Sequence, residues 1–552
     1  MAIAPVPPPP VLPVHAQVLA LNDFHGNLEP PRGHDGTVHA GPGVDLPAGG
    51  AAYLAAHIAR LRAENPRTVV VSAGDLTGAS PLVSNLSQDE ATILVMNRIG
   101  LDFEGVGNHD FDRGLPELLR LQHGGPRVPA AGAPQPTPGA AFPGASFQYL
   151  AANVFGEDGL PVFPPYVIKD LGGVRVAFIG MTLEGTPTVT TKSAITGLKF
   201  GNEAATANSL LPELRRQGAF VPVLLVHQGG FQDDRGTYDS CEGLKGEFLP
   251  VLEVLDPAFR VIVTGHTHQA YDCVIAGRLV TSAGSYGRLV TAIDLAIDPV
   301  KNELVALHAR NVPVTHDIPP DPDVQKLVQD YETLAKPVTE RVVAYQAGSF
   351  VRDPKAAGSA SCESPLGELV ADAQLAATRS AGSVLALMNP GGIRTDLAVP
   401  PGEATPYPVR YAAAFEVQPF GNRLVTLTLT GEALHAILLR QFGRDRPRVL
   451  SVSTGFSYRY AYDPATKLVT VDPASMRLDG KVIDPRGRYR VTVNSFLADG
   501  GDGFTMLRDA TDRTYGVLDI EALVAQLARV GPVRTPLVPP AKLTRIVGNA
   551  CE

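Results

Sequence analysis

The sequence predicts an α/β fold with two unlike domains. Short apolar runs rich in β-branched residues alternate with amphipathic helical patterns through the first half, and a new alternation begins after a Pro-rich break at residues 313–322. Strands that are apolar along their whole length are buried on both faces, which is typical of sheets covered by helices. With 552 residues and 44% hydrophobic side chains, the chain has material for two large cores.

The first half contains five expected strands with helices between them. The strands are expected at residues 18–21, 69–71, 174–179, 221–226 and 261–263, and the helices at residues 51–63, 90–98 and 115–121. Residues 124–144 are rich in Pro, Gly and Ala, and we expect a surface insertion without its own core. We therefore assign residues 15–312 to the first domain and residues 1–14 to a Pro-rich leader.

The second half repeats the α/β alternation with different loops. Residues 324–335 show an amphipathic helical pattern, so we expect residues 313–345 to form a linker with a bridging helix. The second domain, residues 346–552, is expected to be smaller, with helices at residues 366–380 and 431–442 and strands at residues 384–388 and 424–429. No internal repeat relates the two halves, which excludes a duplication.

Composition excludes several classes of partner. The net charge is -9 and no Lys/Arg-rich block occurs, which argues against a nucleic-acid polymer or an anionic membrane surface. No apolar stretch approaches the roughly 18 residues that span a bilayer, so we expect no membrane span. Residues 1–14 lack the basic and apolar regions of a secretion signal, so we expect none in the chain as given.

The four cysteines show no metal-binding or redox spacing. Cys241, Cys273, Cys362 and Cys551 contain no CxxC pair. An even count permits two disulfides, and four separate buried thiols are the alternative. The pairing that respects the expected domains is Cys241 with Cys273 and Cys362 with Cys551.

Five short polar segments each follow an apolar run of the first half. They are Asp23-Phe24-His25, Gly74-Asp75, Gly107-Asn108-His109-Asp110, His227 and Gly265-His266-Thr267-His268. In α/β layers, ligands gather beyond the carboxyl ends of strands, so we expect these segments to converge. Imidazoles, carboxylates and an amide suit zinc, manganese, cobalt or iron better than calcium or magnesium. Each segment alone is more often structural, but five in this order indicate a metal site.

In this order the segments resemble the calcineurin-like metallophosphoesterases, over roughly residues 15–310. The resemblance implies a layered αββα domain and two divalent ions, zinc or manganese first and cobalt or iron as alternatives. Two ions about 3.5 to 4 Å apart need a shared oxygen ligand. The resemblance assigns that role to Asp75, with Asp23, His25 and His268 around one ion and Asn108, His227 and His266 around the other.

Three Gly-rich loops mark the second half, at residues 389–394, 419–422 and 496–504. Taken alone they are equally well explained as tight turns. Beside the metal motifs, and with Ser364-Pro365-Leu366-Gly367 before the expected helix, they resemble the C-terminal domain of the 5′-nucleotidases.

The resemblance implies a nucleotide substrate whose base stacks between Phe420 and Phe496 in the C-terminal domain. Asp502 would bind the ribose hydroxyls, and Asn389, Arg394 and Asn422 would make polar contacts with base, ribose or phosphate. The family also uses an arginine just before the helix at residue 366. Here Ala360 stands near that place and Arg352 is the closest arginine, so the sequence departs from the family pattern.

The implied reaction is hydrolysis of a 5′-nucleotide to nucleoside and phosphate by a hydroxide that the two ions activate. His109 would stabilise the transferred phosphoryl group or assist the leaving oxygen, and Asp112 would orient His109. Asp110 is nearer in sequence, and both acids are otherwise ordinary turn residues.

Other activities use the same residues. A nucleotide-sugar or dinucleotide pyrophosphohydrolase and a 2′,3′-cyclic phosphodiesterase with 3′-nucleotidase activity are the alternatives within this enzyme class. A nucleotide-binding surface protein that lacks catalysis is the alternative outside it. The family and the cysteine count predict a secreted, periplasmic or cell-surface location.

Overall fold

The computed structural model describes residues 12–127, 141–233, 235–442, 448–463, 465–466 and 468–549, apart from the side chain of His34. The chain forms two compact units. The first unit comprises the chain up to Gly78 together with Ser87–Thr186 and Ile195–Tyr331, and the second comprises Ala79–Leu86, Pro187–Ala194 and the chain from Glu332 onward. The last boundary falls inside α8 (Pro322–Thr339), which lies within the predicted linker region.

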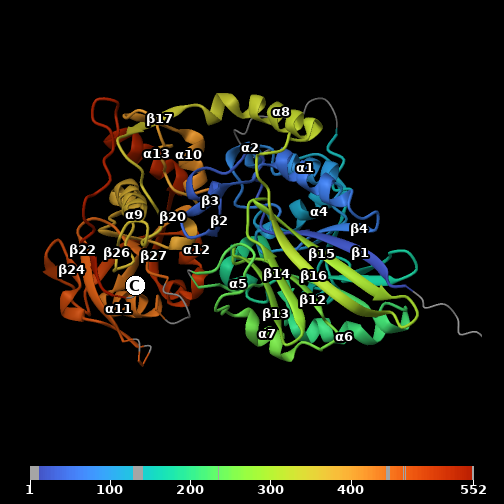
Figure 1. The fold of residues 1–552 in the computed structure, drawn as a ribbon. Helices are drawn as coiled ribbons and strands as arrows, with labels where there is room; N and C mark the ends of the chain where they lie inside the picture. Colours follow the sequence, from blue (N-terminus) through green and yellow to red (C-terminus); the bar gives the residue numbers. More distant parts are fainter. Residues whose placement is uncertain are drawn as a thin grey trace, which may run out of the picture. The chain divides into compact units, whose positions relative to one another are not determined.

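Two six-stranded sheets form the centre of the first unit (Figure 1). One sheet has the order β16–β15–β1–β4–β5–β6 and the other the order β13–β14–β12–β11–β9–β8. The strands of the first sheet are β1 (Val14–Leu21), β4 (Thr68–Ser72), β5 (Phe103–Gly105), β6 (Gln148–Leu150), β15 (Leu289–Asp298) and β16 (Glu303–Pro313). Those of the second are β8 (Tyr166–Asp170), β9 (Arg175–Met181), β11 (Val221–Val226), β12 (Val261–Thr264), β13 (Ala270–Ile275) and β14 (Arg278–Ala283).

The central strands of both sheets are parallel. β1, β4, β5 and β6 run parallel in one sheet, and β9, β11, β12 and β14 run parallel in the other. In each sheet, the carboxyl ends of these strands share one edge, where the following loops converge.

Alternate side chains of each strand enter two different cores. Val176 and Phe178 on β9 pack in the core between the sheets, whereas Ala177 and Ile179 pack in the core beneath α6 and α7. On the other outer face α1 contacts β1 and β15. The helices are α1 (Ala51–Arg62), α3 (Glu90–Ile99), α4 (Leu115–His123), α6 (Glu203–Arg216) and α7 (Phe248–Val254). The predicted layered αββα architecture of this unit is therefore confirmed.

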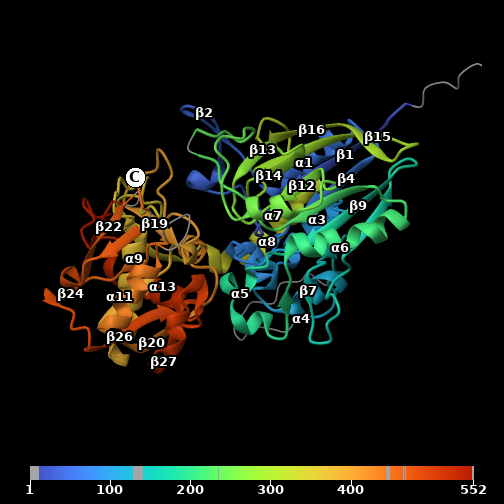
Figure 2. The ribbon, with the colours of Figure 1, turned by 90° about the horizontal axis from the view of Figure 1, so that it is seen from below.

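The second unit is built on a five-stranded mixed sheet of order β21–β18–β26–β20–β27 (Figure 2). Its strands are β18 (Leu385–Met388), β20 (Arg423–Thr430), β21 (Ser451–Val452), β26 (Arg488–Asn494) and β27 (Thr511–Leu518). One face packs against α9 (Pro365–Thr378) and α13 (Asp519–Val530). The other packs against α11 (Gly431–Arg440) and a small sheet centred on β22 (Phe456–Asp463). The predicted second α/β domain is thereby confirmed as a distinct fold.

One of the two predicted cysteine pairs is present as a disulfide. Cys241 and Cys273 are bonded, with Cα atoms 5.1 Å apart, which ties the loop after β11 to β13. Cys551 of the other predicted pair, the leader up to residue 11 and residues 128–140 of the expected insertion lie outside the described residues. Among the helices that the structure describes, none combines the length and apolar character needed to cross a bilayer.

Removing this disulfide should loosen the edge of the second sheet. The bond closes a loop with a sequence separation of 32 residues, so chain entropy predicts a stabilisation of about 3–4 kcal/mol. The Cys241→Ser/Cys273→Ser variant should lose roughly that amount of protection in the β13 and β14 amides, measured by native-state hydrogen exchange. Amides of β18 and β26 are the internal control and should not change, and unchanged protection in β13 would contradict the prediction.

Asp519 is a buried carboxyl at the start of α13. Its side chain accepts a hydrogen bond from the Ile520 N–H at 2.8 Å, and its residue is 1% exposed. Burial raises its pKa from 3.8 to about 7, although hydrogen bonds from Ile520 and Asn422 act in the opposite direction. The native state therefore binds this proton more tightly than the unfolded chain does.

This difference makes the stability of the second unit fall as the pH rises. Below about pH 4 the group is protonated in both states, and between about pH 4 and 7 only the native state retains the proton. Each pH unit in that window should lower the free energy of unfolding by up to about 1.4 kcal/mol. Chemical denaturation at several pH values should show a smaller slope in Asp519→Asn, because the raised pKa of Glu368, about 7, gives a remaining slope of the same sign. The exposed Asp512→Asn variant is the control, and an unchanged slope in Asp519→Asn would sink the assignment.

Candidate metal centre and nucleotide pocket

The predicted metal ligands occupy loops at the carboxyl edges of the two sheets. Asp23 and His25 follow β1, Asp75 follows β4, and Asn108 follows β5 in the first sheet; His227 follows β11, and His266 and His268 follow β12 in the second. Five of them have a left-handed backbone, with φ of 50° at Asp23, 47° at His25, 56° at Asp75, 70° at His266 and 56° at His268. Non-glycine residues rarely adopt this conformation, and a cluster of them typically marks a functional site.

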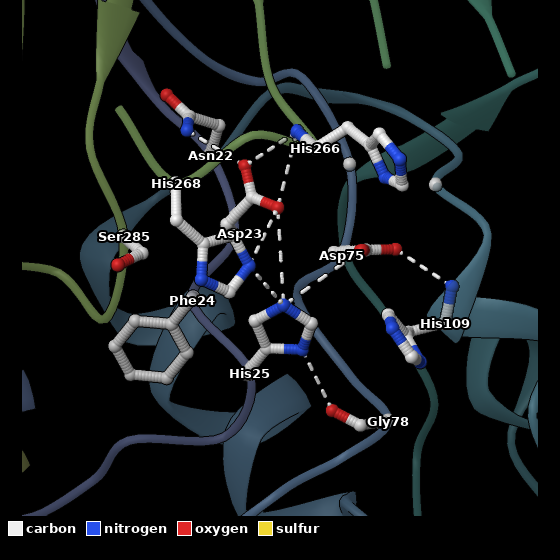
Figure 3. Close-up of polar contacts among 12 residues, drawn as sticks. Asn22, Asp23, Phe24, His25, Asp75, Gly78, His109, His266, His268 and Ser285 are labelled. Atoms are coloured by element: carbon white, nitrogen blue, oxygen red, sulfur yellow. Dashed lines mark hydrogen bonds and ion pairs between the residues drawn. The ribbon is translucent and has the colours of Figure 1, made fainter. Parts of the chain in front are cut away.

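Six of these side chains form two groups that could each hold a metal ion. Figure 3 labels Asp23, His25 and His268 of one group and Asp75 and His266 of the other. The first group is Asp23, His25 and His268, and the second is Asp75, His227 and His266, with the ligand atoms of each group within 4.8 Å of one another. These groups match the division that the family resemblance implies. Asn108, the seventh predicted ligand, is fully buried in the loop after β5.

Glycines allow the loops to approach this closely. A Cβ on Gly74 would lie 2.7 Å from His227 Nδ1 and from the Gly107 nitrogen, and a Cβ on Gly107 would lie 2.1 Å from Asp75 Oδ1. No other residue type fits these contacts without a backbone shift. The two glycines therefore bring the Asn108 loop, Asp75 and His227 together.

Asp75 lies between the two groups. Its Oδ2 atom is 2.9 Å from His227 Nε2 of its own group and 3.7 Å from His25 Nε2 of the other. Its Oδ1 atom accepts the backbone N–H of His109 at 2.8 Å. One carboxylate oxygen thus faces imidazoles of both groups, which is the position that a bridging ligand requires.

Backbone carbonyls fix the orientation of two imidazoles. His25 Nδ1 lies 2.8 Å from the Gly78 oxygen and His227 Nδ1 lies 2.7 Å from the Ala73 oxygen. A carbonyl can only accept, so Nδ1 carries a proton in each ring and Nε2 is the atom that faces the carboxylates. Burial acts to lower the pKa of His227, but Asp75 raises it to about 9, so a bound ion would replace a proton on this imidazole. Imidazoles and carboxylates fit borderline divalent ions.

Nearby imidazoles keep the carboxylates of Asp23 and Asp75 ionised, which is the form that binds a cation. Burial acts to raise the pKa of Asp23, but the His268 and His227 imidazoles lower it to about 2. Burial also opposes ionisation of Asp75, yet His227 and His109 hold its pKa well below the usual value. Burial lowers the pKa of His266 to about 3, with His227 contributing, so this imidazole is neutral. Two anionic carboxylates beside a neutral imidazole make a cation-binding centre.

His109 borders this centre and is held by Asp112. Its Nδ1 atom is 2.9 Å from Asp112 Oδ2, and its ring centroid is 5.2 Å from that of His25. The contact with the carboxylate directs Nδ1–H to Asp112, which leaves Nε2 to act on another group. His109 and Asp112 are therefore arranged as the resemblance implies.

Asp110 does not orient His109 but binds backbone groups of two loops, a role that the sequence left open. Its carboxylate accepts the backbone N–H groups of Gly107 at 2.8 Å and of Asp75 and Thr77 at 3.0 Å, and also the Thr77 hydroxyl at 2.8 Å. Burial and the neighbouring Asp75 raise its pKa to about 6. Asp110 thus ties the loop after β5 to the loop after β4, and both loops carry predicted ligands.

Asn22 is a second supporting residue that the sequence did not indicate. Its Nδ2 donates to Asp23 Oδ2 at 2.7 Å and to the Gly284 oxygen at 2.7 Å, and its Oδ1 accepts the Ala283 N–H at 2.8 Å (Figure 3). The His266 N–H donates to the same Asp23 oxygen at 2.9 Å. An asparagine after a strand carries no distinctive sequence signal, so only the fold shows that Asn22 orients Asp23.

The predicted nucleotide contacts come together in the second unit. Asn389 Nδ2 donates to Asp502 Oδ2 at 2.8 Å, and the Arg394 guanidinium lies 5.7 Å from the centroid of Phe420. Phe496 packs so closely on Gly501 that an added Cβ would lie 2.4 Å from its Cζ atom. Asn422 accepts a hydrogen bond from Ser495, the neighbour of Phe496, at 3.0 Å. The three Gly-rich loops are therefore adjacent, with Phe420 and Phe496 both partly exposed.

Arginines near these loops differ in their partners. Arg394 Nη2 is buried and has no hydrogen-bond partner among the described residues. Arg352, the closest substitute for the missing family arginine, donates to the Ile393 oxygen at 3.4 Å. Arg448, which sequence analysis did not single out, donates to Asp502 Oδ1. Arg352 thus contacts the loop that carries Arg394, and Arg448 contacts Asp502.

Two family models match the chain in this order. The calcineurin-like phosphoesterase model matches residues 16–270, and the 5′-nucleotidase C-terminal domain model matches residues 342–509. The solved 5′-nucleotidase precursor of Thermus thermophilus has 27% identity and a TM-score of 0.76, with 97% of this chain and 99% of that chain covered.

Curated relatives extend over most of this chain. Endonuclease YhcR of Bacillus subtilis (strain 168) is 32% identical over 88% of this chain and 37% of its own length. Cell wall protein Lmo0130 of Listeria monocytogenes is 29% identical over 90% of this chain and 65% of its own length. The chain spans less than two thirds of either relative. By its two matched domains, the chain belongs to the 5′-nucleotidase family, in which a calcineurin-like phosphoesterase domain precedes a 5′-nucleotidase C-terminal domain.

Proposed function

We propose that the chain hydrolyses 5′-nucleotide phosphate monoesters to nucleoside and phosphate. The observation that carries the proposal is the position of Asp75 between two imidazole groups, with His109 bound to Asp75 through its backbone and to Asp112 through its side chain. The pocket at Asn389, Phe420, Phe496 and Asp502 supports a nucleotide as the substrate, since base stacking on an aromatic ring contributes about 1–3 kcal/mol. The base would bind in the second unit.

Asp23, His25 and His268 would hold one divalent ion, Asn108, His227 and His266 the other, and Asp75 both. Zinc or manganese fits this donor set best, and cobalt or iron is the alternative. When bound, two such ions polarise phosphoryl oxygens and activate a water molecule for attack on phosphorus. No side-chain nucleophile is then required.

His109 supplies the side-chain chemistry of the proposal. Its Nδ1–H is directed to Asp112, so Nε2 is the atom available to the phosphoryl group or the leaving ribose oxygen. A protonated imidazole stabilises negative charge that develops on the phosphoryl oxygens and can donate its proton to the leaving oxygen. Asp112 stabilises that protonated form and fixes the ring.

A second candidate is cleavage of phosphodiesters or pyrophosphates. The curated relative with 32% identity is named an endonuclease, which places a diester among the substrates to be tested. Nucleotide sugars, dinucleotides and 2′,3′-cyclic nucleotides are the small diesters and pyrophosphates that the same centre could take. The products decide between these reactions, since monoester hydrolysis of AMP releases adenosine.

We also propose that the protein works outside the cytoplasm. The Cys241–Cys273 disulfide is typical of oxidising compartments. The relative named a cell wall protein supports the same location.

The function is tested by chromatographic analysis of the products from AMP, ATP, UDP-glucose and 2′,3′-cyclic AMP, because cleavage of a diester or pyrophosphate alone releases no free phosphate. Metal-depleted protein should be inactive and should regain AMP hydrolysis with added manganese or zinc. His109→Ala should lower kcat for AMP by about 10²–10⁴-fold, because a positioned acid–base group is lost. Its metal content should stay unchanged, since His109 is not among the proposed ligands.

His123→Ala is the matched control for this variant. His123 lies exposed at the end of α4 in the same unit, and its loss should leave AMP hydrolysis intact. Absence of turnover with every metal and substrate would refute the proposed activity, while turnover of the diesters alone would favour the second candidate.

Metal stoichiometry tests the shared role of Asp75. His268→Ala removes a ligand from one group and should leave about one ion per chain after dialysis, measured by elemental analysis. Asp75→Ala removes the shared oxygen and should leave fewer than about one, because both sites lose a ligand. Equal metal content in the two variants would argue against a bridging Asp75.

A further inference from the structure

Asp502 lies in a chain of polar contacts that engages both of its carboxylate oxygens. Asn389 Nδ2 donates to Oδ2 at 2.8 Å, and Asn494 Nδ2 in turn donates to Asn389 Oδ1 at 2.9 Å. The Arg448 guanidinium donates from Nη1 to Oδ1 of the same carboxylate. The side chain of Asp502 is 9% exposed and that of Arg448 is 37% exposed. A nearly enclosed carboxylate is thus held by an inner amide and an outer guanidinium.

The backbone fixes the carboxylate beside the stacking ring. Asp502 has a left-handed φ of 53° between Gly501 and Gly503. The same turn carries Gly501, on which the Phe496 ring packs. The distance between the ring and the carboxylate is therefore set by a short stretch of backbone and a closely packed contact, which makes this part of the pocket rigid.

The lone pairs of Asp502 suit a vicinal diol. A carboxylate offers about four acceptor positions, and the amide and the guanidinium use two of them. One position remains on each oxygen, and these can accept two neighbouring O–H donors. A ribose presents such a pair in its 2′ and 3′ hydroxyls.

Arg448 contributes to this arrangement through the carboxylate. Charge-assisted contacts of a guanidinium with a carboxylate are stronger and more directional than neutral ones. An ion pair between exposed groups contributes little, but Asp502 is almost buried, so removing its cation leaves a carboxylate without its compensating charge. The carboxylate would then turn or take up water in place of Arg448.

We propose that Arg448 is a positioning residue that holds Asp502 for the two hydroxyls of ribose and so makes the pocket select ribonucleosides over nucleosides that lack them. This inference rests on the proposed function, because it takes the base to stack at Phe496. Arg448 is expected to act on the sugar through Asp502 and not to bind the phosphate.

The test is calorimetric binding of adenosine and 2′,3′-dideoxyadenosine to the full, metal-depleted chain, in which no hydrolysis occurs. The wild-type chain should bind adenosine more tightly than the dideoxy analogue. Arg448→Ala should weaken adenosine binding by about tenfold and change binding of the analogue by less than about twofold. Arg448→Lys keeps the positive charge but loses the planar guanidinium. Its affinity for adenosine should therefore lie between those of the wild type and of Arg448→Ala.

A double-mutant cycle separates this role from a general structural one. Asp502→Asn should remove most of the ribose preference, and adding Arg448→Ala to it should have no further effect on adenosine. Arg488→Ala is the matched control: Arg488 pairs with Asp512 at the opposite end of β26 from Asn494, and both side chains are 63% exposed. It should bind both nucleosides as the wild type does.

Three outcomes would overturn the inference. Equal weakening of both nucleosides by Arg448→Ala, in a chain whose thermal unfolding is unchanged, would indicate a structural role. Weaker AMP binding with unchanged adenosine binding would make Arg448 a phosphate contact. If the wild-type chain bound neither adenosine nor AMP, the proposed function would be refuted together with this inference. The first two outcomes refute only the role of Arg448, so the two cases are distinguishable.

Discussion

Asp75 Oδ2 and His227 Nε2 lie 2.9 Å apart, and this contact joins a loop of one sheet to a loop of the other. Both side chains are buried, so neither charge is solvated by water. A buried carboxylate is stable there because imidazoles surround it, and it holds the His109 backbone through its second oxygen. The two sheets must therefore pack in one register for the centre to form. The Val- and Leu-rich core between the sheets supplies the energy that enforces this packing.

Residues outside the predicted ligand set hold the ligands in position through hydrogen bonds. Asp110 binds the backbone N–H groups of Gly107, Asp75 and Thr77, and Asn22 holds Asp23. The Gly78 and Ala73 carbonyls fix the rings of His25 and His227. Left-handed backbone at five predicted ligands costs conformational energy, and these hydrogen bonds offset that cost. A metal site assembled from several loops is rigid only when the loops are tied to one another.

The sequence predicted the centre well because its signals are local. Most of the ligand segments follow apolar runs, and the parallel order of β1, β4 and β5 and of β11 and β12 places those ends on shared edges. The long antiparallel strands β15 and β16 were not predicted, since polar and charged residues interrupt the apolar sequence of both and few residues of β16 are fully buried. Asn22, Asp110 and Arg448 were not assigned roles for a related reason. Their partners are mostly distant in the sequence or are backbone groups, which leave no pattern in the sequence.

Under the proposed function, the two units would reach specificity by different physical means, as follows. The first relies on charge, since two carboxylates among imidazoles in a buried site attract divalent ions and, with them, an anionic phosphate. The second relies on shape and hydrogen bonding, with aromatic faces and a carboxylate fixed by Asn389, Arg448 and the turn at Gly501–Gly503. Stacking tolerates every base, whereas a buried carboxylate rejects a sugar that leaves its lone pairs unfilled. Discrimination in the second unit should therefore rest on the sugar more than on the base.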